Sequence, residues 1–202
     1  MIAFLKGKVD FKSDSFVIID VNNVGYKVFM PEKDIAEIED DKITKIFTYM
    51  RVTQEDVSLY GFLTNDELAM FELLLTVGGI GAKSAIAILS NIEPSQFALA
   101  IITNDISMLK KLPGIGPKTA QRIVLELQDK IKSNDAIKAD SEVKNAVKFN
   151  QNAKDAIDAL QVLGYTRRDV EDVVSKMKID NMSVEDIIKE GLKRLWQIIM
   201  NL

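Results

Sequence analysis

The sequence contains no cysteine and no histidine among its 202 residues. Without cysteine the chain can form no disulfide, no zinc–thiolate site and no thiol nucleophile, and without histidine it lacks the commonest general base and metal ligand. Chemistry based on carboxylates, serine or lysine stays open, but both absences count against an enzyme. Long hydrophobic runs are also missing, since nowhere do about eighteen apolar residues follow one another, and the N-terminus shows no long apolar segment with a cleavage site. We therefore expect a soluble cytoplasmic protein that needs no metal or other cofactor.

Positive charge is scarce overall, because 26 Lys and Arg stand against 30 Asp and Glu for a net charge of -4. The content of 47% hydrophobic and 28% charged residues is that of a globular protein. The acidic excess is uneven: residues 1–75 hold 8 basic and 14 acidic residues, residues 76–132 hold 7 and 4, and residues 133–202 hold 11 and 12. Only the middle segment is basic, so it is the part expected to meet a polyanion.

The first 63 residues contain short runs rich in Val, Ile, Phe and Tyr, separated by turn signals such as Asn22-Asn23. Five such runs with a helical interruption near residues 31–38 predict a small closed barrel of the OB type. The predicted strands are Ile2–Val9, Phe16–Val21, Gly25–Met30, Thr44–Tyr49 and Val57–Phe62.

From Asn65 onward apolar residues recur at helical spacing, which places a domain boundary at about residue 64. Residues 133–151 are polar and predict a flexible linker. Beyond them, two apolar stripes and a capping-box pattern at Ser183 predict three short helices that form a UBA-like bundle. The fold is therefore expected to be α+β and multidomain, with segments 1–63, 64–132, 133–151 and 152–202.

The basic middle segment carries one motif twice, 35 residues apart. Gly79–Ala85 reads GIGAKSA and Gly114–Ala120 reads GIGPKTA, and each copy lies between two apolar segments with helical spacing. Helix, tight Gly-x-Gly turn and helix make up a helix-hairpin-helix unit, so residues 64–132 are expected to hold two of these units in tandem.

The composition of the repeated motif suits a phosphate of a nucleic-acid backbone. Glycine permits the sharp turn and lets a ligand approach the backbone, and the amides and dipole at the start of the following helix favour an anion. A lysine in the first turn of a helix is disfavoured unless an anion lies beside it. Binding should therefore be independent of base sequence. The candidate DNA-binding residues are Gly79, Gly81, Lys83, Gly114, Gly116, Lys118 and Arg122.

Two other interpretations of the motif have to be weighed. A nucleotide-binding P-loop needs four residues between its glycines, whereas here one residue separates Gly114 from Gly116, and Pro117 removes an amide donor, so ATP is a poor candidate ligand. A Gly-x-Gly turn can also be a plain helix connection. Several basic residues nearby could simply be solvated: Lys110, Lys111, Lys130 and Lys132.

The whole chain resembles the RuvA family of bacterial Holliday-junction-binding proteins. The resemblance rests on Val-Gly-Tyr at 24–26, Glu-Asp-Val-Ser-Leu-Tyr-Gly-Phe at 55–62, Leu-Pro-Gly-Ile-Gly-Pro-Lys-Thr-Ala at 112–120, a variable linker, and Ala-Leu-Gln-Val-Leu-Gly-Tyr at 159–165. It implies a non-catalytic subunit that binds four-way DNA junctions, holds them open and recruits the RuvB ATPase for branch migration in recombination, DNA repair and the SOS response. It also implies a homotetramer or octamer, the RuvC resolvase as a further partner, and RuvB docking through residues 152–202.

In this family paired hairpins grip the duplex backbone, and an acidic pin lies at the tetramer centre. The resemblance assigns the pin to Glu55 and Asp56, and it assigns hairpin roles to the DNA-binding candidates named above. By itself, a Glu-Asp pair between strands is usually a solvated turn, and a metal-dependent nuclease would need further acidic ligands. Two departures weaken the correspondence: Pro117 stands where many relatives have a basic residue, and the C-terminal segment around Trp196 is unusually apolar.

Two functions from other classes stay open at this point. One is a helix-hairpin-helix DNA-processing enzyme, such as a glycosylase or nuclease, which would turn over a labelled junction or lesion duplex by itself. The other is a protein-binding scaffold with incidental DNA binding, which would bind duplex and four-way DNA equally and weakly.

Overall fold

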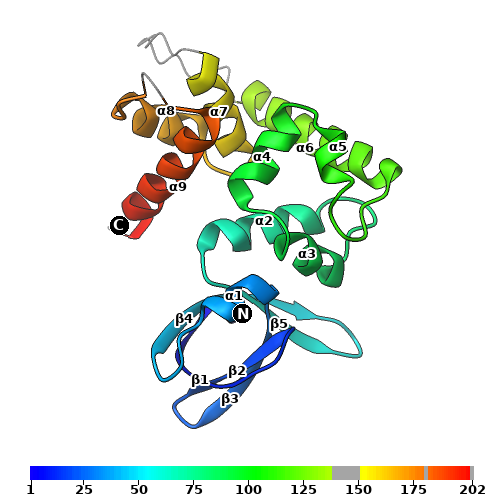
Figure 1. The fold of residues 1–202 in the computed structure, drawn as a ribbon, viewed down its shortest axis with the longest axis vertical. Coiled ribbons are helices and arrows are strands. Elements are labelled where there is room, and N and C mark those ends of the chain that lie inside the picture. The colour runs from blue at the N-terminus through cyan, green and yellow to red at the C-terminus, as the bar shows by residue number, and fades with distance from the viewer. Residues whose placement is uncertain (138–150, 180–181, 201–202) are drawn as a thin grey trace. The chain divides into compact units, whose positions relative to one another are not determined.

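The structure, a computed structural model, describes residues 1–137, 151–179 and 182–200 (Figure 1). The described residues form two compact units. The first comprises Met1–Thr76 and Ile80–Ile92, and the second comprises Val77–Gly79 and the described residues from Glu93 onward. The short segment Val77–Gly79 therefore packs with the second unit, although the helices on either side of it belong to the first.

A closed five-stranded barrel opens the first unit (Figure 1). Its strands are β1 (Phe4–Lys12), β2 (Phe16–Val21), β3 (Val24–Phe29), β4 (Ile43–Val52) and β5 (Val57–Phe62). They neighbour one another in the order β1-β2-β3-β5-β4, with β1 also paired to β4, and only the β3–β5 pair is parallel. Fully buried side chains such as Val17, Ile19, Val28 and Ile46 fill the interior. The predicted OB-type barrel is confirmed.

The predicted strand bounds match the structure in two of the five strands and differ by one or more residues in the others. β2 and β5 have the predicted bounds. β1 ends at Lys12 rather than Val9, because an irregularity between Val9 and Phe11 shifts the register and lets pairing with β2 continue. Asn22 and Asn23 have φ of 54° and 64°, as a two-residue type I′ turn requires.

Helix α2 (Asn65–Leu75) is attached to the barrel by an aromatic cluster. The ring centroid of fully buried Phe71 lies 5.5 Å from that of Tyr49, 5.3 Å from that of Tyr60 and 5.0 Å from that of Phe62. Three buried rings and the half-buried ring of Tyr49 supply both apolar burial and favourable ring geometry. The barrel therefore fixes the direction of α2.

The short helix α1 (Glu32–Glu37) forms a second connection within the first unit. The carboxylate of Asp34, only 2% exposed, accepts from the Leu63 amide at 3.2 Å, and the Lys33 ammonium lies 3.0 Å from the Glu67 carboxylate. Burial, and next the charge of Glu67, raise the pKa of Asp34 to about 8. At neutral pH Asp34 is therefore mostly protonated and hydrogen-bonded to Glu67 on α2.

Two further contacts stabilise this part of the first unit. Thr64 and Glu67 form a capping box at the start of α2. The Glu32 amide donates to Ser90 Oγ at 3.3 Å, at the end of α3 (Ala82–Leu89). Barrel, α2 and α3 thus share hydrogen bonds as well as apolar contacts.

Helices make up the second unit. The first three are α4 (Pro94–Ile102), α5 (Ile106–Leu109) and α6 (Pro117–Ile137). Fully buried Phe97, Ile101 and Ile123 form part of their core. The Gln128 side-chain amide donates to the Ile101 carbonyl at 2.7 Å and so ties α6 to the end of α4.

The three predicted C-terminal helices are α7 (Gln151–Val162), α8 (Arg167–Ser175) and α9 (Val184–Met200). The two predicted apolar stripes are buried: Ala156, Ile157, Leu160 and Leu163, and then Val170, Val173, Val174 and Met177. Gly164 follows α7 with φ of +94°, and Ser183 Oγ accepts from the Asp186 amide at 3.2 Å at the start of α9. Trp196 on α9 is half-buried. The predicted combination of barrel, central helices and C-terminal helices is confirmed.

Most of the expected linker, residues 138–150, lies outside the described residues. Its first part does not: α6 runs to Ile137, five residues beyond the boundary expected at residue 132. Residues 133–137 are mostly polar, but they contain neither Gly nor Pro, so nothing in the chain stops the helix there.

No single helix of the described ranges is long and apolar enough to cross a membrane. Only α3 and α4 taken together, across a sharp break, reach the necessary length and composition. Ile88, Leu89, Phe97 and Ile101 of this pair are fully buried in the fold.

Candidate nucleic-acid interface

The first copy of the repeated motif forms the turn between α2 and α3. Gly79 has φ of +91°, Ile80 is buried, and Gly81 is the N-cap of α3. The first backbone bond of the helix runs from the Ala85 amide to the Gly81 carbonyl at 2.9 Å. The positive φ at Gly79 is a conformation that glycine adopts without steric cost.

The second copy repeats this geometry before α6. Gly114 has φ of +75°, Ile115 is buried, and the Ala120 amide donates to the Gly116 carbonyl at 2.9 Å. Each copy therefore has the same turn, the same buried isoleucine as anchor and the same first helical bond. The repeat seen in the sequence is a repeat in structure.

Gly81 and Gly116, the second glycine of each motif, are required neither by a positive φ nor by packing against any residue that the structure describes. Both have φ outside the left-handed region, and a Cβ added to either would meet nothing within 4 Å. Gly79 and Gly114 differ, since their positive φ alone accounts for glycine. Open space at an exposed helix start is what the approach of an external ligand to the backbone requires.

The amides at the start of α3 have no side-chain cap. No cap side chain accepts a hydrogen bond at the start of α3, and a helix leaves its first amides without intrahelical partners. With the helix dipole, these amides favour an anion.

Lys83 and Lys118 occupy matching positions in the first turns of α3 and α6, and both are exposed. Neither forms an ion pair with any residue in the described part of the chain. An ammonium group in the first turn of a helix, without an ion-pair partner among the described residues, can contact a phosphate at that helix start.

Arg122, the third predicted cation, has an internal partner. Its guanidinium donates to the Gly78 carbonyl at 3.0 Å, and Glu126 on the next turn of α6 accepts from the Gly78 amide at 3.2 Å. Arg122 Nε also lies 3.8 Å from the Glu126 carboxylate. The backbone carbonyl and amide of Gly78, in the first hairpin turn, are thus both held by side chains of α6. The position of Arg122 in the sequence did not indicate this contact.

Glu126 was not among the predicted site residues. Its spacing of four residues from Arg122 was visible in the sequence and predicts an ion pair on one helix face. Nothing in the sequence connects either residue to Gly78, because that contact joins positions 44 and 48 residues apart.

The predicted pin residues, Glu55 and Asp56, are exposed in the connection between β4 and β5. Thr53 closes this turn, because its amide donates to the Asp56 carbonyl at 2.8 Å and its hydroxyl accepts from the Asp56 amide at 3.0 Å. The Asp56 carboxylate also accepts from Ser58 Oγ. Two carboxylates thus lie at the tip of a rigid β-hairpin.

No group of three or more acidic residues that could hold a metal ion occurs among the residues whose placement is described.

Comparison with known proteins covers all three parts of the chain. Residues 1–61 match the RuvA N terminal domain, residues 71–129 the SAM-like helix-hairpin-helix tandem, and residues 151–195 the RuvA C-terminal domain.

Three relatives that match over nearly their whole length share the name Holliday junction branch migration complex subunit RuvA. The protein from Acetivibrio thermocellus is 43% identical over 199 residues, covering 96% of this chain and 98% of the relative. Those from Rickettsia prowazekii and Lachnospira eligens are 41% and 36% identical, and each comparison covers 96% of this chain and 97% or 99% of the relative. With its barrel, its two hairpin motifs and its C-terminal helices in the same order, the chain belongs to the RuvA family.

Proposed function

We propose that this protein binds four-way DNA junctions through their sugar-phosphate backbone, independently of base sequence, and holds them open as a non-catalytic subunit of a cytoplasmic branch-migration complex. The observation that carries the proposal is the pair of glycines, Gly81 and Gly116, which neither conformation nor packing explains. They leave two equivalent helix starts open to a phosphate. The relatives' printed name, a subunit of a Holliday junction branch migration complex, supports the same conclusion.

The hairpins supply the proposed grip. At each hairpin, free amides bind phosphate oxygens, and Lys83 or Lys118 neutralises the charge. Because these contacts reach the backbone and not the base edges, affinity should depend strongly on salt and weakly on sequence.

The pin supplies the proposed selectivity. In a four-fold assembly, eight carboxylates from Glu55 and Asp56 would lie near the point where strands exchange partners. Like charges about 6 Å apart repel by roughly 0.7 kcal/mol even at the dielectric constant of water. Duplex crossing the centre would meet this repulsion, whereas an open junction has a hole there.

The remaining parts of the proposal concern partners. The C-terminal helices α7, α8 and α9 dock the RuvB ATPase, which supplies the motor, and the junction-bound tetramer or octamer is the platform on which the RuvC resolvase acts. The family match over residues 151–195 and the relatives' naming as complex subunits support these assignments.

The experiment compares binding to a four-way junction and to duplex of the same sequence in gel shifts, for the parent and for Gly81→Ala with Gly116→Ala. The parent should prefer the junction. The double variant should still fold, at a cost of up to about 1 kcal/mol because Gly81 is the N-cap of α3 and alanine is a poorer N-cap than glycine. It should bind about tenfold more weakly, because two methyl groups obstruct the phosphates.

Gly114→Ala is the control for loss of stability. Because Gly114 has φ of +75°, alanine at this position costs about 1 kcal/mol of folding free energy with or without bound DNA. Full junction affinity in a folded Gly81→Ala, Gly116→Ala protein would contradict the phosphate contacts. Equal affinity of the parent for junction and duplex would contradict junction selectivity.

A further inference from the structure

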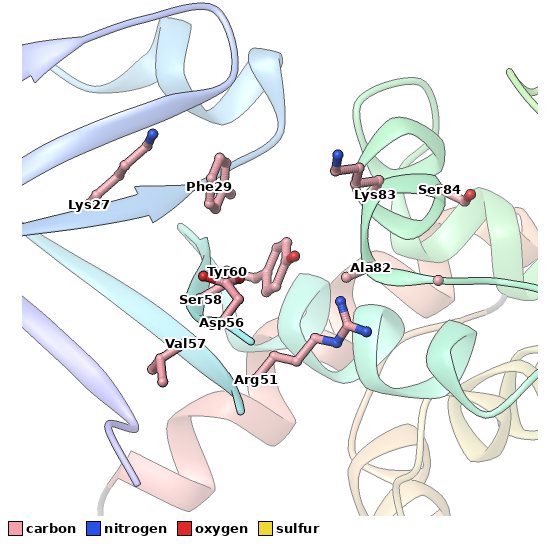
Figure 2. A pocket seen from close by; sticks show the side chains of 11 residues that line it. Lys27, Phe29, Arg51, Asp56, Val57, Ser58, Tyr60, Ala82, Lys83 and Ser84 are labelled. Carbon is pink, nitrogen blue, oxygen red and sulfur yellow. The ribbon is translucent and has the colours of Figure 1, made fainter. Parts of the chain in front are cut away.

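A pocket of about 620 Å³ lies within the first unit, between the barrel and the start of α3 (Figure 2). Lys27 of β3 and Arg51 of β4 line it from the barrel, and Gly81, Lys83 and Ser84 line it from the hairpin. None of the family-derived assignments gives this pocket a role.

Basic side chains dominate the charge of the pocket. Lys27, Arg51 and Lys83 oppose one lining carboxylate, that of Asp56, whose oxygen accepts from Ser58 Oγ. None of these three cations has an ion-pair partner among the residues that the structure describes. The pocket therefore carries an excess of two positive charges that no internal carboxylate balances.

The hairpin side of the pocket adds uncapped amides. The first helical bond of α3 runs from the Ala85 amide to the Gly81 carbonyl. The amides of Ala82, Lys83 and Ser84, which precede it, therefore have no helical acceptor, and these three residues line the pocket. Three cations and the positive end of a helix together favour a compact anion.

We propose that this pocket holds a phosphodiester group of the bound DNA, contacted by Lys27 and Arg51 from the barrel and by the start of α3 from the hairpin. The inference rests on the proposed function, and it extends the DNA footprint of each subunit from the hairpin to the barrel. The Asp56 carboxylate also lines this pocket and repels the phosphate, which therefore sits on the side of Lys27 and Lys83. The same carboxylate limits how closely the DNA strand approaches the β4–β5 hairpin.

The chain offers a closely matched control for Lys27. The Lys27 ammonium lies 4.2 Å from the ring centroid of Phe16 and 5.1 Å from that of Phe29. The Lys45 ammonium lies over two phenylalanines of the same barrel in the same way, 4.8 Å and 4.6 Å from their ring centroids, but Lys45 does not line the pocket. Lys27→Ala and Lys45→Ala thus remove the same charge and the same kind of cation–π contact.

The test measures junction affinity of the full chain between 50 and 200 mM salt for the parent, Lys27→Ala, Lys45→Ala and Lys27→Ala with Arg51→Ala. One lost phosphate contact flattens the slope of log affinity against log salt by about 0.9, so the advantage of the parent over Lys27→Ala should shrink about threefold across this range. The double variant should lose about twice that slope. Lys45→Ala should keep the parent slope. Light scattering checks that each variant keeps the parent's oligomeric state.

A second arm separates backbone phosphate from free phosphate, by following the amides of residues 82–84 by NMR during titration with inorganic phosphate at constant ionic strength. Weak shifts at these amides, lost in Lys27→Ala with Arg51→Ala, together with the flattened slope, would support the proposal. Equal slopes for Lys27→Ala and Lys45→Ala would overturn it, and so would phosphate binding without any change in junction affinity. In both cases the parent still binds junctions, so the proposed function stands; loss of junction preference in the parent would instead remove the proposed function itself.

Discussion

Two cations of α6 differ in their contacts: Lys118 has no ion-pair partner among the described residues, whereas Arg122 contacts Gly78 and Glu126. Arg122 and Glu126 hold the carbonyl and the amide of Gly78 and so fix the first hairpin turn, although the Arg122 side chain is 57% exposed. A side chain of this kind affects DNA binding through the geometry of another segment.

Glu126→Ala tests this role, because the expected change in junction affinity is opposite in sign to the change that charge alone predicts. Removing an acidic side chain near a DNA-binding surface should strengthen binding if only charge matters. If Glu126 positions the turn, junction affinity should fall about fivefold, or about 1 kcal/mol, within the range for a partly exposed hydrogen bond to a charged group. Gel shifts measure the affinity, and hydrogen exchange should show faster exchange at the Gly78 and Gly79 amides.

Glu72→Ala is the control for that experiment, because Glu72 is exposed on α2 and its replacement by alanine removes the same charge. It should leave affinity unchanged or raise it. Unchanged or tighter binding by Glu126→Ala, with unaltered exchange at Gly78, would show that the turn holds its shape without α6.

A second residue-scale effect concerns the protonated carboxyl of Asp34. Its folded-state pKa of about 8 lies above the ordinary value of 3.8, so its contribution to stability is fully present below about pH 4 and is lost as the pH rises through about 8. The loss amounts to about 1.4 kcal/mol per pH unit within that window, as an upper limit because the charge of Lys33 offsets part of the repulsion between Asp34 and Glu67.

Asp34→Asn should remove this dependence. Asparagine keeps an acceptor for the Leu63 amide and can donate to Glu67 at any pH. Urea unfolding should show the variant more stable than the parent at pH 8, with the difference vanishing toward pH 4. Asp14→Asn, at an exposed position, should follow the parent, and a parent profile parallel to that of Asp34→Asn would refute the raised pKa.

At the scale of elements, the β4–β5 hairpin is a rigid support for two charges. Thr53 closes its turn with three hydrogen bonds to backbone groups of Asp56, and these bonds do not depend on the charge of either side chain. Glu55→Gln with Asp56→Asn should therefore change charge and not shape.

This neutral variant should gain affinity for duplex more than for junction, which lowers the junction-to-duplex ratio. The change should fade as salt shortens the screening length. Parallel titrations of both DNAs at low and high salt measure it. An unchanged ratio at low salt would make Glu55 and Asp56 an ordinary solvated turn.

Elements whose side chains alternate or recur in the sequence were predictable, and contacts between elements were not. The bounds of β2 and β5 followed from runs of β-branched and aromatic residues, and the two Gly-x-Gly turns followed from an internal repeat. The partnership of Asp34 with Glu67 had no such signal, since each looks like a surface residue in its own helix. Its burial results from docking α1 against α2, which no local pattern encodes.

The candidate site divides in the same way. Glycines and lysines in a repeated motif were recognisable because the motif has a physical meaning by itself. Lys27 and Arg51 carry no motif; they reach the start of α3 only because the barrel and that helix belong to one compact unit. The contact of Arg122 with Gly78 was not predictable for the same reason, because the two residues are distant in sequence.

At the scale of the whole molecule, DNA binding and motor recruitment are assigned to different segments. The barrel and hairpins end with α6 at Ile137, and the C-terminal helices begin at Gln151. A chain ending at residue 150 should bind junctions with the affinity of the full chain but should not support ATP-driven branch migration when RuvB is added.

The measurement is strand exchange on a labelled mobile junction, with junction gel shifts of both chains as the control for folding. Full branch migration by the shortened chain would remove the C-terminal helices from the docking role. Loss of junction affinity would show that these helices support the DNA-binding part.

The single tryptophan of the sequence, half-buried on α9, makes the C-terminal helices optically distinct from everything else in the chain. Selective excitation of Trp196 reports on these helices alone, while the four tyrosines, three of them in the barrel, stay silent. Its emission is therefore an intrinsic, label-free signal for events at the C-terminal helices. Partner docking and local unfolding there can be followed by fluorescence in the natural chain, independently of what the DNA-binding part is doing.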